Sequence, residues 1–492
     1  MAGLRRRRGR DRRRRAGAEA GHLPRVPSDP VTGPADRGGP GFAATAIVIA
    51  AWLSVIAPFV ASLLYVNAYG VDVFYADEWD LVPLLRDQAR GTLGIADLFD
   101  HHNEHVYLFP WSLTLIVGRF TGYDTVPMML VVVCCLLLTS LGTFWAYTST
   151  VARSRFALLL FFPLPFLLLS LRQYENMLWG NQISFAFAQT FSVLALCLLL
   201  AAGEGPRSTL VLTVAVLCAT VASYSAVPGL LVWPAGLLLL LASRGARTPS
   251  RWVLTGAWGL SGALVWGGYF AGYGGSVGSA GPSFVLGHPA TSATYLVTLS
   301  GGSLFWQAGT SRMVGLLLVF IVAAAVALVL ALRQVRENAF WLALLAFSLM
   351  SLALIATGRS GFGEDVFAQA TLSRYAAFSV PGVVALYGLL ANLALNARSR
   401  VAAVLLGVLL VAVLTGTARS YQLGLEAGRE TEQSRRAARQ ILANHESEPL
   451  AAFTIFGHYP PRVQNFARFL DRHDYGVFAK DAADGAGVNG GP

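Results

Sequence analysis

Charged side chains are scarce in this chain. Only 13% of its 492 residues are Asp, Glu, Lys or Arg, whereas 55% are hydrophobic, and a typical soluble domain carries about 25% charged residues. Apolar runs of about 20 residues recur along the sequence, and each is long enough to cross a hydrocarbon core of about 30 Å. This composition excludes a soluble globular protein, and it predicts that most of the chain forms one helical membrane domain.

Lysine and cysteine are also rare. Lys480 is the only lysine, so we attribute the arginine-rich basic content to coding bias more than to a selected chemistry. The chain has four cysteines, all within apolar runs: Cys134, Cys135, Cys197 and Cys218. None of them forms a CxxC pair or lies in a loop where a disulfide would help, so we interpret them as small core residues.

The net charge of +10 is concentrated at the N-terminus. Residues 1–41 contain eleven Arg and four acidic residues, which is +7 of that total. The arginine run at 5–15 could contact anionic lipid or nucleic acid. We favour a disordered cytoplasmic tail over residues 1–42, because the segment has no apolar core and Pro and Gly are frequent in its second half. We therefore expect no nucleic-acid partner.

The apolar pattern predicts an all-α polytopic helical membrane protein with about 11 transmembrane helices. The predicted spans are 43–66, 125–147, 156–171, 183–202, 209–225, 227–243, 252–271, 313–332, 339–357, 376–395 and 400–417.

Arginine-bearing loops fix the expected sidedness, because short basic loops face the cytoplasm. With the N-terminus inside and eleven spans, every basic loop between spans falls inside. The apolar stretches 106–121 and 292–308 must then be interfacial or re-entrant; if both crossed, the basic loops between them would face outward. We expect a transmembrane domain over 43–418 in the plasma membrane, with juxtamembrane helices in its first outer loop. Residues 419–492 would form a short extracytoplasmic tail.

The first outer loop carries adjacent carboxylates just beyond the first span. Asp77 and Glu78 lie at a membrane boundary, where an acidic group can act as a general base or a metal ligand. Two neighbouring carboxylates walled by apolar helices also perturb each other's pKa. We interpret Asp77 and Glu78 as candidate catalytic residues. For Asp80 we favour capping of a short helix over 78–90.

Three of the eight histidines fall within five residues of the same loop. His101 and His105 are four residues apart and would share one face of a helix, with Glu104 adjacent. That arrangement could bind a divalent metal, although it is not an HExxH motif. We interpret His102, Glu104 and His105 as substrate-binding residues, expect no certain cofactor, and leave a divalent metal as the open alternative.

The second outer loop, residues 171–182, combines aromatic rings with amides and an acid. Rings stack on the apolar face of a sugar, while amides and acids bind its hydroxyl groups. An aromatic belt at the membrane interface would explain the rings but not the polar groups beside them. The candidate sugar-binding residues of this loop are Gln173, Tyr174, Glu175, Asn176, Trp179 and Gln182.

The last outer loop places an arginine at each of its two helix ends. Arg359 closes one span and Arg374 opens the next, against the tendency of basic residues to lie inside. Guanidinium groups bind phosphate bidentately, and a lipid phosphate would lie at this depth. Snorkelling to lipid headgroups is the alternative. We interpret Arg359, Arg374 and the neighbouring Tyr375 as substrate-binding residues.

Taken together, these features resemble the GT-C superfamily of polytopic membrane glycosyltransferases, in an uncharacterised bacterial branch, over roughly residues 43–470. The resemblance rests on Asp77-Glu78 after the first span, on the His/Asn/Glu cluster, on the segment 173–182 and on Ser373-Arg374-Tyr375. The usual His-Pro-Pro pattern of the family is absent here, since His105 is followed by Val-Tyr.

The resemblance implies a polyprenyl-phosphate sugar donor. It implies that Asp77 or Glu78 activates the acceptor hydroxyl and that Arg359 or Arg374 holds the donor phosphate. We therefore expect an inverting transferase that moves a sugar to a cell-envelope glycan or lipid acceptor.

Two other functions stay open. One is an O-antigen-type polymerase or ligase. The other is a lipid-linked-sugar flippase or secondary transporter, which we disfavour because no span has a charge at its centre and no internal repeat is evident.

Overall fold

The computed structural model describes residues 42–202, 208–243, 249–275, 280–362 and 365–479. The chain divides into two compact units, Met1–Phe42 and Ala43–Pro492. The predicted arginine-rich tail lies outside the described residues, except for its last residue. All that follows concerns the second unit.

This unit is built from helices. The α-helices are α1 (Phe42–Tyr69), α2 (Val82–Arg90), α3 (Leu108–Thr121), α4 (Val126–Thr150), α5 (Pro163–Leu168), α6 (Tyr174–Met177), α7 (Ile183–Ala201), α8 (Ser208–Ser223), α9 (Val232–Ala242), α10 (Pro249–Phe270), α11 (Gly281–Gly287), α12 (Pro289–Gly301), α13 (Ala308–Ala331), α14 (Ala339–Arg359), α15 (Val366–Gln369), α16 (Ala376–Leu395), α17 (Arg400–Ala443) and α18 (Pro460–Arg472). The 3-10 helices are Ala76–Leu81, Ile95–Phe99, Arg155–Phe161, Leu171–Gln173, Gly180–Gln182, Val227–Leu231, Ser373–Tyr375, Leu450–Phe456 and Gly476–Phe478. The strands are β1 (His101–His102) and β2 (His105–Val106), which pair antiparallel.

Every predicted apolar span contains helix, which confirms the all-α polytopic class, although 156–171 is divided between the 3-10 helix Arg155–Phe161 and α5. Among the described residues, eight helical segments are long and apolar enough to cross a membrane, fewer than the eleven expected. The other three predicted spans correspond to α8, α9 and α10. Helices α8 and α9 are apolar but shorter than the other spans, with 16 and 11 residues.

The two stretches that we expected not to cross are short helices. Helix α3 has 14 residues and α12 has 13. At 1.5 Å per residue each is about 20 Å long, less than the roughly 30 Å of a hydrocarbon core. Their lengths agree with an interfacial or re-entrant position, which stays a prediction.

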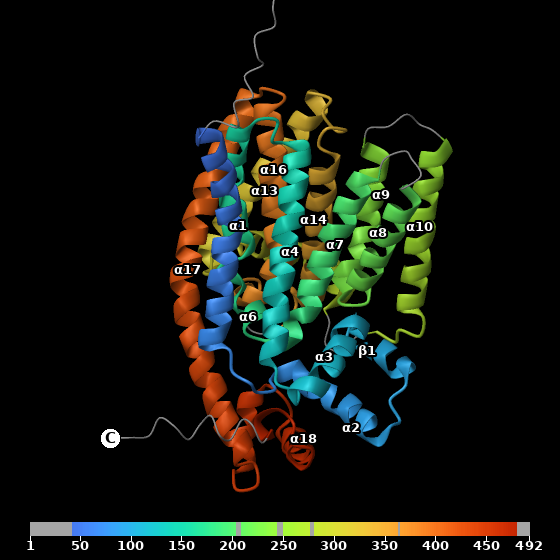
Figure 1. Ribbon diagram of the computed structural model, residues 1–492, viewed down its shortest axis with the longest axis vertical. Helices are drawn as coiled ribbons and strands as arrows, with labels where there is room; N and C mark the ends of the chain where they lie inside the picture. Colours follow the sequence, from blue (N-terminus) through green and yellow to red (C-terminus); the bar gives the residue numbers. More distant parts are fainter. Residues whose placement is uncertain (1–41, 203–207, 244–248, 276–279, 363–364, 480–492) are drawn as a thin grey trace, which may run out of the picture. The chain divides into compact units, whose positions relative to one another are not determined.

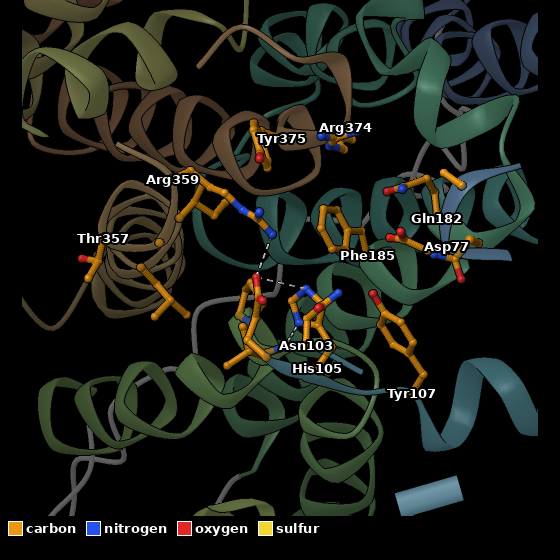
Figure 2. Close-up of a pocket in the computed structure, with 18 of the residues that line it drawn as sticks. Asp77, Asn103, His105, Tyr107, Gln182, Phe185, Thr357, Arg359, Arg374 and Tyr375 are labelled. Carbon is orange, nitrogen blue, oxygen red and sulfur yellow. Dashed lines mark hydrogen bonds and ion pairs between the residues drawn. The ribbon is translucent and has the colours of Figure 1, made fainter. Parts of the chain in front are cut away.

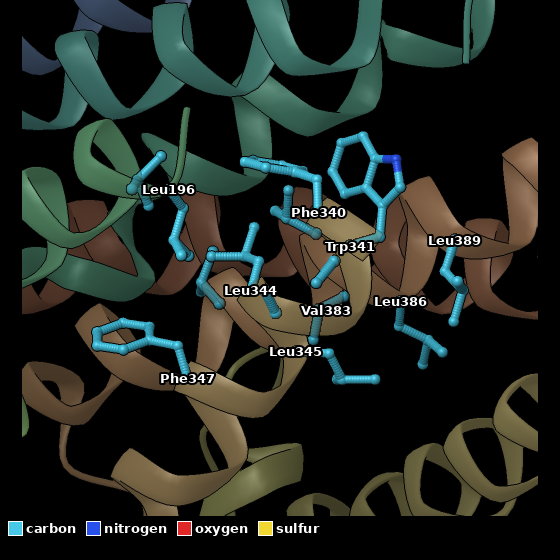
Figure 3. Packing of buried hydrophobic residues seen from close by; sticks show 14 of the residues in the cluster. Leu196, Phe340, Trp341, Leu344, Leu345, Phe347, Val383, Leu386 and Leu389 are labelled. Atoms are coloured by element: carbon cyan, nitrogen blue, oxygen red, sulfur yellow. The ribbon is translucent and has the colours of Figure 1, made fainter. Parts of the chain in front are cut away.

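The main hydrophobic core lies between α7, α9, α14 and α16. The indole of Trp341 on α14 is fully buried, and it packs against Gly388 of α16, where an added Cβ would lie 2.5 Å from the ring. Figure 3 shows this layer, with Phe340 and Leu344 of α14 facing Leu196 of α7. Because glycine admits the indole, α14 and α16 approach closely and form a rigid support for the loops at their ends.

The two ends of the helical bundle differ in charge. At one end, Trp341 donates to Thr150 Oγ1 (3.0 Å) and Asn396 donates to the carbonyl of Val151 (3.1 Å), so three of the arginine-bearing loops meet there. The loops with carboxylates, histidines and amides gather at the other end, with α2 and α3 (Figure 1). This separation is what the positive-inside reasoning requires; which end faces the cytoplasm stays a prediction.

The C-terminal residues pack on the first loop. Helix α17 has 44 residues and extends past the ends of α1 and α4 (Figure 1). The segment after it folds back, and the Phe456 ring contacts Trp79 at 5.5 Å between centroids. Both side chains are fully buried. The boundary expected at residue 418 falls inside α17, so the tail continues the membrane helix and covers the first loop.

Candidate active site

A cavity of about 540 Å³ opens where the three polar loops meet. Eight of the fourteen candidate residues from the sequence line it: Asp77, Glu104, His105, Trp179, Gln182, Arg359, Arg374 and Tyr375. In Figure 2, Asp77 lies beside Gln182, and Arg359 lies across the cavity, with Phe185 between them in this view. Two carboxylates, Asp77 and Glu104, and two guanidinium groups therefore face one cavity.

The two adjacent acids of the first loop point in different directions. Asp77 lines the cavity and is half-buried. The Glu78 carboxylate is buried and accepts the backbone N–H groups of Tyr75 (2.9 Å) and Asn181 (3.1 Å). Burial raises the pKa of Glu78 to about 8, although these hydrogen bonds oppose the rise. Glu78 thus ties the first loop to the second, and Asp77 is the acid available for chemistry.

Close backbone approach makes the Glu78 contact possible. The 3-10 turn Gly180–Gln182 passes so near the carboxylate that a Cβ on Gly180 would lie 2.9 Å from Glu78 Oε1. Glycine is the residue that permits such an approach. This contact fixes Gln182 at the cavity wall, immediately before the first residue of α7.

Asp80 does not cap a helix, so that prediction is wrong. It lies inside the 3-10 helix Ala76–Leu81, and the N-cap of α2 is Leu81, which makes no side-chain capping bond. Instead the Asp80 carboxylate contacts Arg462 Nη2 (3.2 Å) and His458 Nε2 (3.3 Å). Both partners come from the C-terminal segment, about 380 residues away in sequence, a distance that local capping rules do not consider.

The histidines lie on a β-hairpin, so the helical arrangement expected for His101 and His105 is also wrong. His102 pairs with His105 across the two strands, and His101 pairs with Val106. Asn103 makes the turn with a φ of 55°, a left-handed conformation that asparagine tolerates better than most residues. The hairpin brings Glu104 and His105 to the cavity, whereas His102 packs on the rings of Tyr107 and Trp111.

Glu104 pairs with an arginine across the cavity. Arg359 Nη2 lies 3.0 Å from Glu104 Oε1, and His105 Nε2 lies 3.8 Å from the same oxygen. Burial would raise the pKa of Glu104, but His105 and Arg359 outweigh it and the pKa is lowered. Burial lowers the pKa of His105 to about 4, so the imidazole is neutral near pH 7, and its Nδ1 accepts the N–H of Val227 (3.2 Å).

Part of the second loop is structural. The buried Gln173 side chain donates to the carbonyl of Leu168 (2.7 Å). Asn176 donates to Gln173 Oε1 (3.1 Å) and to the carbonyl of Arg374 (3.2 Å). The structure places these two amides outside the cavity, where they join the second and last loops. Trp179 and Gln182 are the residues of this loop that reach the main cavity.

Tyr174 and Glu175 line a second cavity of about 310 Å³. Glu175 Oε2 accepts the N–H of Arg374 (2.9 Å), and Tyr174 stacks on Trp306 with ring centroids 5.4 Å apart. The side chains of Trp179 and Arg374 line both cavities. These two side chains are therefore shared by the walls of both cavities.

Three ligand atoms in the first loop lie close enough to hold a metal ion. Among the described residues, atoms of Asp77, Asp80 and His102 all lie within 4.8 Å of one another. Two carboxylates and an imidazole suit a divalent cation such as Mn²⁺ or Zn²⁺. A cation here would share the Asp80 carboxylate with Arg462. A divalent metal, the alternative that the sequence left open, would therefore bind at this group and not at the His101/His105 pair.

Several cavity residues were not expected from the sequence. Tyr107, Asn103 and Asn181 also line the main cavity. Burial, together with Asp77 and Glu104, raises the pKa of Tyr107 well above its ordinary value, so its hydroxyl stays protonated and can donate a hydrogen bond. In the sequence, these three residues lie next to the histidine cluster or to Gln182, and this position could have identified them.

No sequence profile of a known family matches the chain, and no curated protein matches it. Among solved structures, it is similar to archaeal oligosaccharyltransferase AglB from Archaeoglobus fulgidus, determined in complex with an inhibitory peptide and a dolichol-phosphate. The TM-score is 0.44 and the sequence identity 13%, over 83% of this chain. The chain matches 58% of the length of that protein.

Proposed function

We propose that this protein is a membrane glycosyltransferase that moves a sugar from a polyprenyl-phosphate-linked donor to a cell-envelope glycan or lipid acceptor on the outer face of the membrane. The observation that carries the proposal is the convergence of Asp77, Arg359 and Arg374 on one cavity of about 540 Å³. A base facing two cationic groups suits displacement of a phosphate.

In the proposed reaction, Asp77 accepts the proton of the acceptor hydroxyl as its oxygen attacks the anomeric carbon. The new glycosidic C–O bond forms while the bond from the anomeric carbon to the phosphate oxygen breaks, with inversion. The polyprenyl phosphate leaves with the electron pair, and Arg359 and Arg374 stabilise its charge. Because the bilayer presents the donor already oriented, the entropic cost of bringing it together with the acceptor is lower.

Aromatic and amide groups would orient the sugar. Trp179 and Tyr375 supply ring faces, and Gln182 supplies an amide whose Oε1 is buried without a protein partner. A buried acceptor without a donor is costly unless a ligand satisfies it. A sugar hydroxyl would do so. If a divalent cation binds at Asp77, Asp80 and His102, it would supply further positive charge beside the leaving phosphate.

The test is transfer of a labelled hexose from a synthetic polyprenyl phosphate to an envelope extract, by the full chain in lipid nanodiscs. Asp77→Asn keeps the shape of the side chain but removes the base, and we expect kcat to fall by about 100-fold or more. The matched control is Glu432→Gln, a carboxylate on α17 whose partner is Arg436, and it should leave transfer unchanged. Unchanged transfer by the Asp77 variant would refute the base assignment.

The arginines are tested separately. Replacing Arg359 or Arg374 by Gln should raise KM for the donor about tenfold or more, since each removes a charged hydrogen bond to phosphate. Translocation of a fluorescent lipid-linked sugar without any transfer would favour the flippase instead.

A further inference from the structure

A basic groove lies between α2 and α18, away from the main cavity. It has a volume of about 470 Å³, and its lining residues are Arg86, Ala89, Arg90, Asn465, Arg468, Phe469, Arg472 and His473. Helices α2 and α18 lie next to each other at the lower end of the bundle (Figure 1). The groove therefore gathers four guanidinium groups and an imidazole around one opening, and none of its described lining residues is acidic.

The four arginines form two pairs that face the groove from opposite helices. Arg86 and Arg90 are four residues apart on α2, and Arg468 and Arg472 are four residues apart on α18. Residues with this spacing lie on one helix face, about 6 Å apart. Within the described chain, none of these four side chains lies within ion-pair distance of a carboxylate. Their positive charge is thus available to a ligand.

Arg86 is held in place by rings instead of by an acid. Its guanidinium lies 4.7 Å from the Phe466 ring centroid and 5.3 Å from that of Phe469. Its Nη2 also donates to the carbonyl of Asn465 (3.3 Å). Partial burial, with Arg90 and Arg462 nearby, lowers its pKa. An anion in the groove would relieve this mutual repulsion, and the rings already orient the guanidinium.

Helix α17 carries the C-terminal segment past the end of the first span. Gly424 and Gly428 of α17 lie beside Tyr65 of α1, and 15 further residues follow before the helix ends at Ala443. Those residues span about 22 Å, more than the several ångströms of a headgroup layer. Helix α18 follows this extension and packs on the first loop. A lipid headgroup is therefore a poorer match for the groove than an anionic chain in the aqueous space.

The groove is also connected to the proposed catalytic acid. Arg462, on the first turn of α18, contacts Asp80 (3.2 Å), and Asp80 lies in the same group as Asp77. Arg468 and Arg472 are six and ten residues further along this helix, which is about 9 and 15 Å. A chain bound in the groove could extend along α18 to the cavity.

We propose that the basic groove between α2 and α18 binds the phosphate groups of a polyanionic acceptor glycan and holds that acceptor beside the main cavity. The proposal rests on the glycosyltransferase function proposed above. Guanidinium pairs bind phosphate through two parallel hydrogen bonds, and two pairs on facing helices can hold successive phosphates of one chain.

The experiment measures binding and transfer separately. The full chain is placed in nanodiscs of uncharged lipid, and the probe is a fluorescent oligomer of glycerol phosphate, followed by anisotropy. The test variant is Arg468→Glu with Arg472→Glu, two exposed side chains on α18. The control is Arg419→Glu with Arg429→Glu, two exposed side chains on α17 that change the net charge equally. Arg90→Glu on α2 is a second, independent test variant.

We expect the two groove variants to weaken probe binding at least about tenfold, while the control stays within about twofold and all variants keep the melting temperature of the wild type. Equal weakening in the control would show a diffuse charge effect and overturn the proposal. Unchanged binding of the glycerol phosphate probe by the groove variants would also overturn the proposal, in particular if those variants lost binding to anionic phosphatidylglycerol vesicles instead. Asp77→Asn should bind the probe normally, so failure of that variant to lose transfer would count against the proposed function and leave the groove assignment standing.

Discussion

Glu78 is a buried carboxyl group that should make the stability of the fold depend on pH. Burial raises its pKa to about 8 from an ordinary 4.5. The folded state therefore holds a proton that the unfolded state has released over this range. Where the folded state binds more protons, stability falls as the pH rises. The contribution of Glu78 is thus most favourable below about pH 4.5 and is lost progressively up to about pH 8.

The size of the effect follows from these two values. One pH unit corresponds to about 1.4 kcal/mol, so the whole difference is about 5 kcal/mol. About 3 kcal/mol of it is lost between roughly pH 6 and pH 9, and most of that below pH 8. This is a large part of the about 5–15 kcal/mol that stabilises a typical domain.

Glu78→Gln removes the titration and keeps the size of the side chain. Its amide NH2 must face one of the two backbone N–H groups that the carboxylate accepts, from Tyr75 and Asn181. We expect the variant to be about 1–3 kcal/mol less stable than the wild type at about pH 6, and its own stability should not change with the titration of this position. The variant should therefore be less stable than the wild type at about pH 6, and the gap should close or reverse by about pH 9.

The measurement is denaturant or thermal unfolding of both proteins in detergent, followed by tryptophan fluorescence at several pH values. The control is Asp72→Asn, because burial raises the pKa of Asp72 to about 7, so it titrates lower. That variant should keep the loss of stability seen between about pH 7 and pH 8. Parallel curves for the wild type and Glu78→Gln would refute the buried, protonated state of Glu78.

Three further changes test the packing and the cavity. Gly315→Ala places a Cβ 1.9 Å from the carbonyl oxygen of Val297, so α12 and α13 must separate, and we expect a loss of about 1–3 kcal/mol as a lower melting temperature; an unchanged melting temperature would contradict this contact. Phe456→Ala empties a fully buried site and should cost about 3–5 kcal/mol, seen as faster tryptic cleavage of the C-terminal segment than in the wild type. Glu104→Gln removes the carboxylate that pairs with Arg359, and we expect KM for the donor to fall about threefold, because phosphate no longer competes with Glu104; a higher KM would mean that Glu104 positions the arginine.

The sequence predicted the membrane architecture well because its signal is local. Each span is a continuous apolar run, and eight of the eleven predicted runs are helical segments long and apolar enough to cross a membrane. The meeting of the polar loops at one end was also predictable, since arginine in the alternate loops separates the two sides. Asp77, Arg359 and Arg374, which line the main cavity, were selected in this way, as polar residues next to the ends of spans; their roles stay a prediction.

The errors concern interactions between residues far apart in sequence. Four-residue spacing made His101 and His105 look helical, but the turn at Asn103 folds them into a hairpin. The sequence around Asp80 is typical of a helix cap and contains no sign of Arg462. Glu78 and Asp77 are adjacent and chemically alike, and only the close approach of Gly180 shows which of them is buried.

The contact between Asp80 and Arg462 also has a consequence for biosynthesis. Ribosomes emit the first loop about 380 residues before its partner on α18. The wall that holds Asp80 in place therefore forms only after Arg462 has been synthesised. A chain terminated before that residue would be inserted in the bilayer with its spans in place but with an unfinished first loop, so under the proposed function such fragments should be inactive.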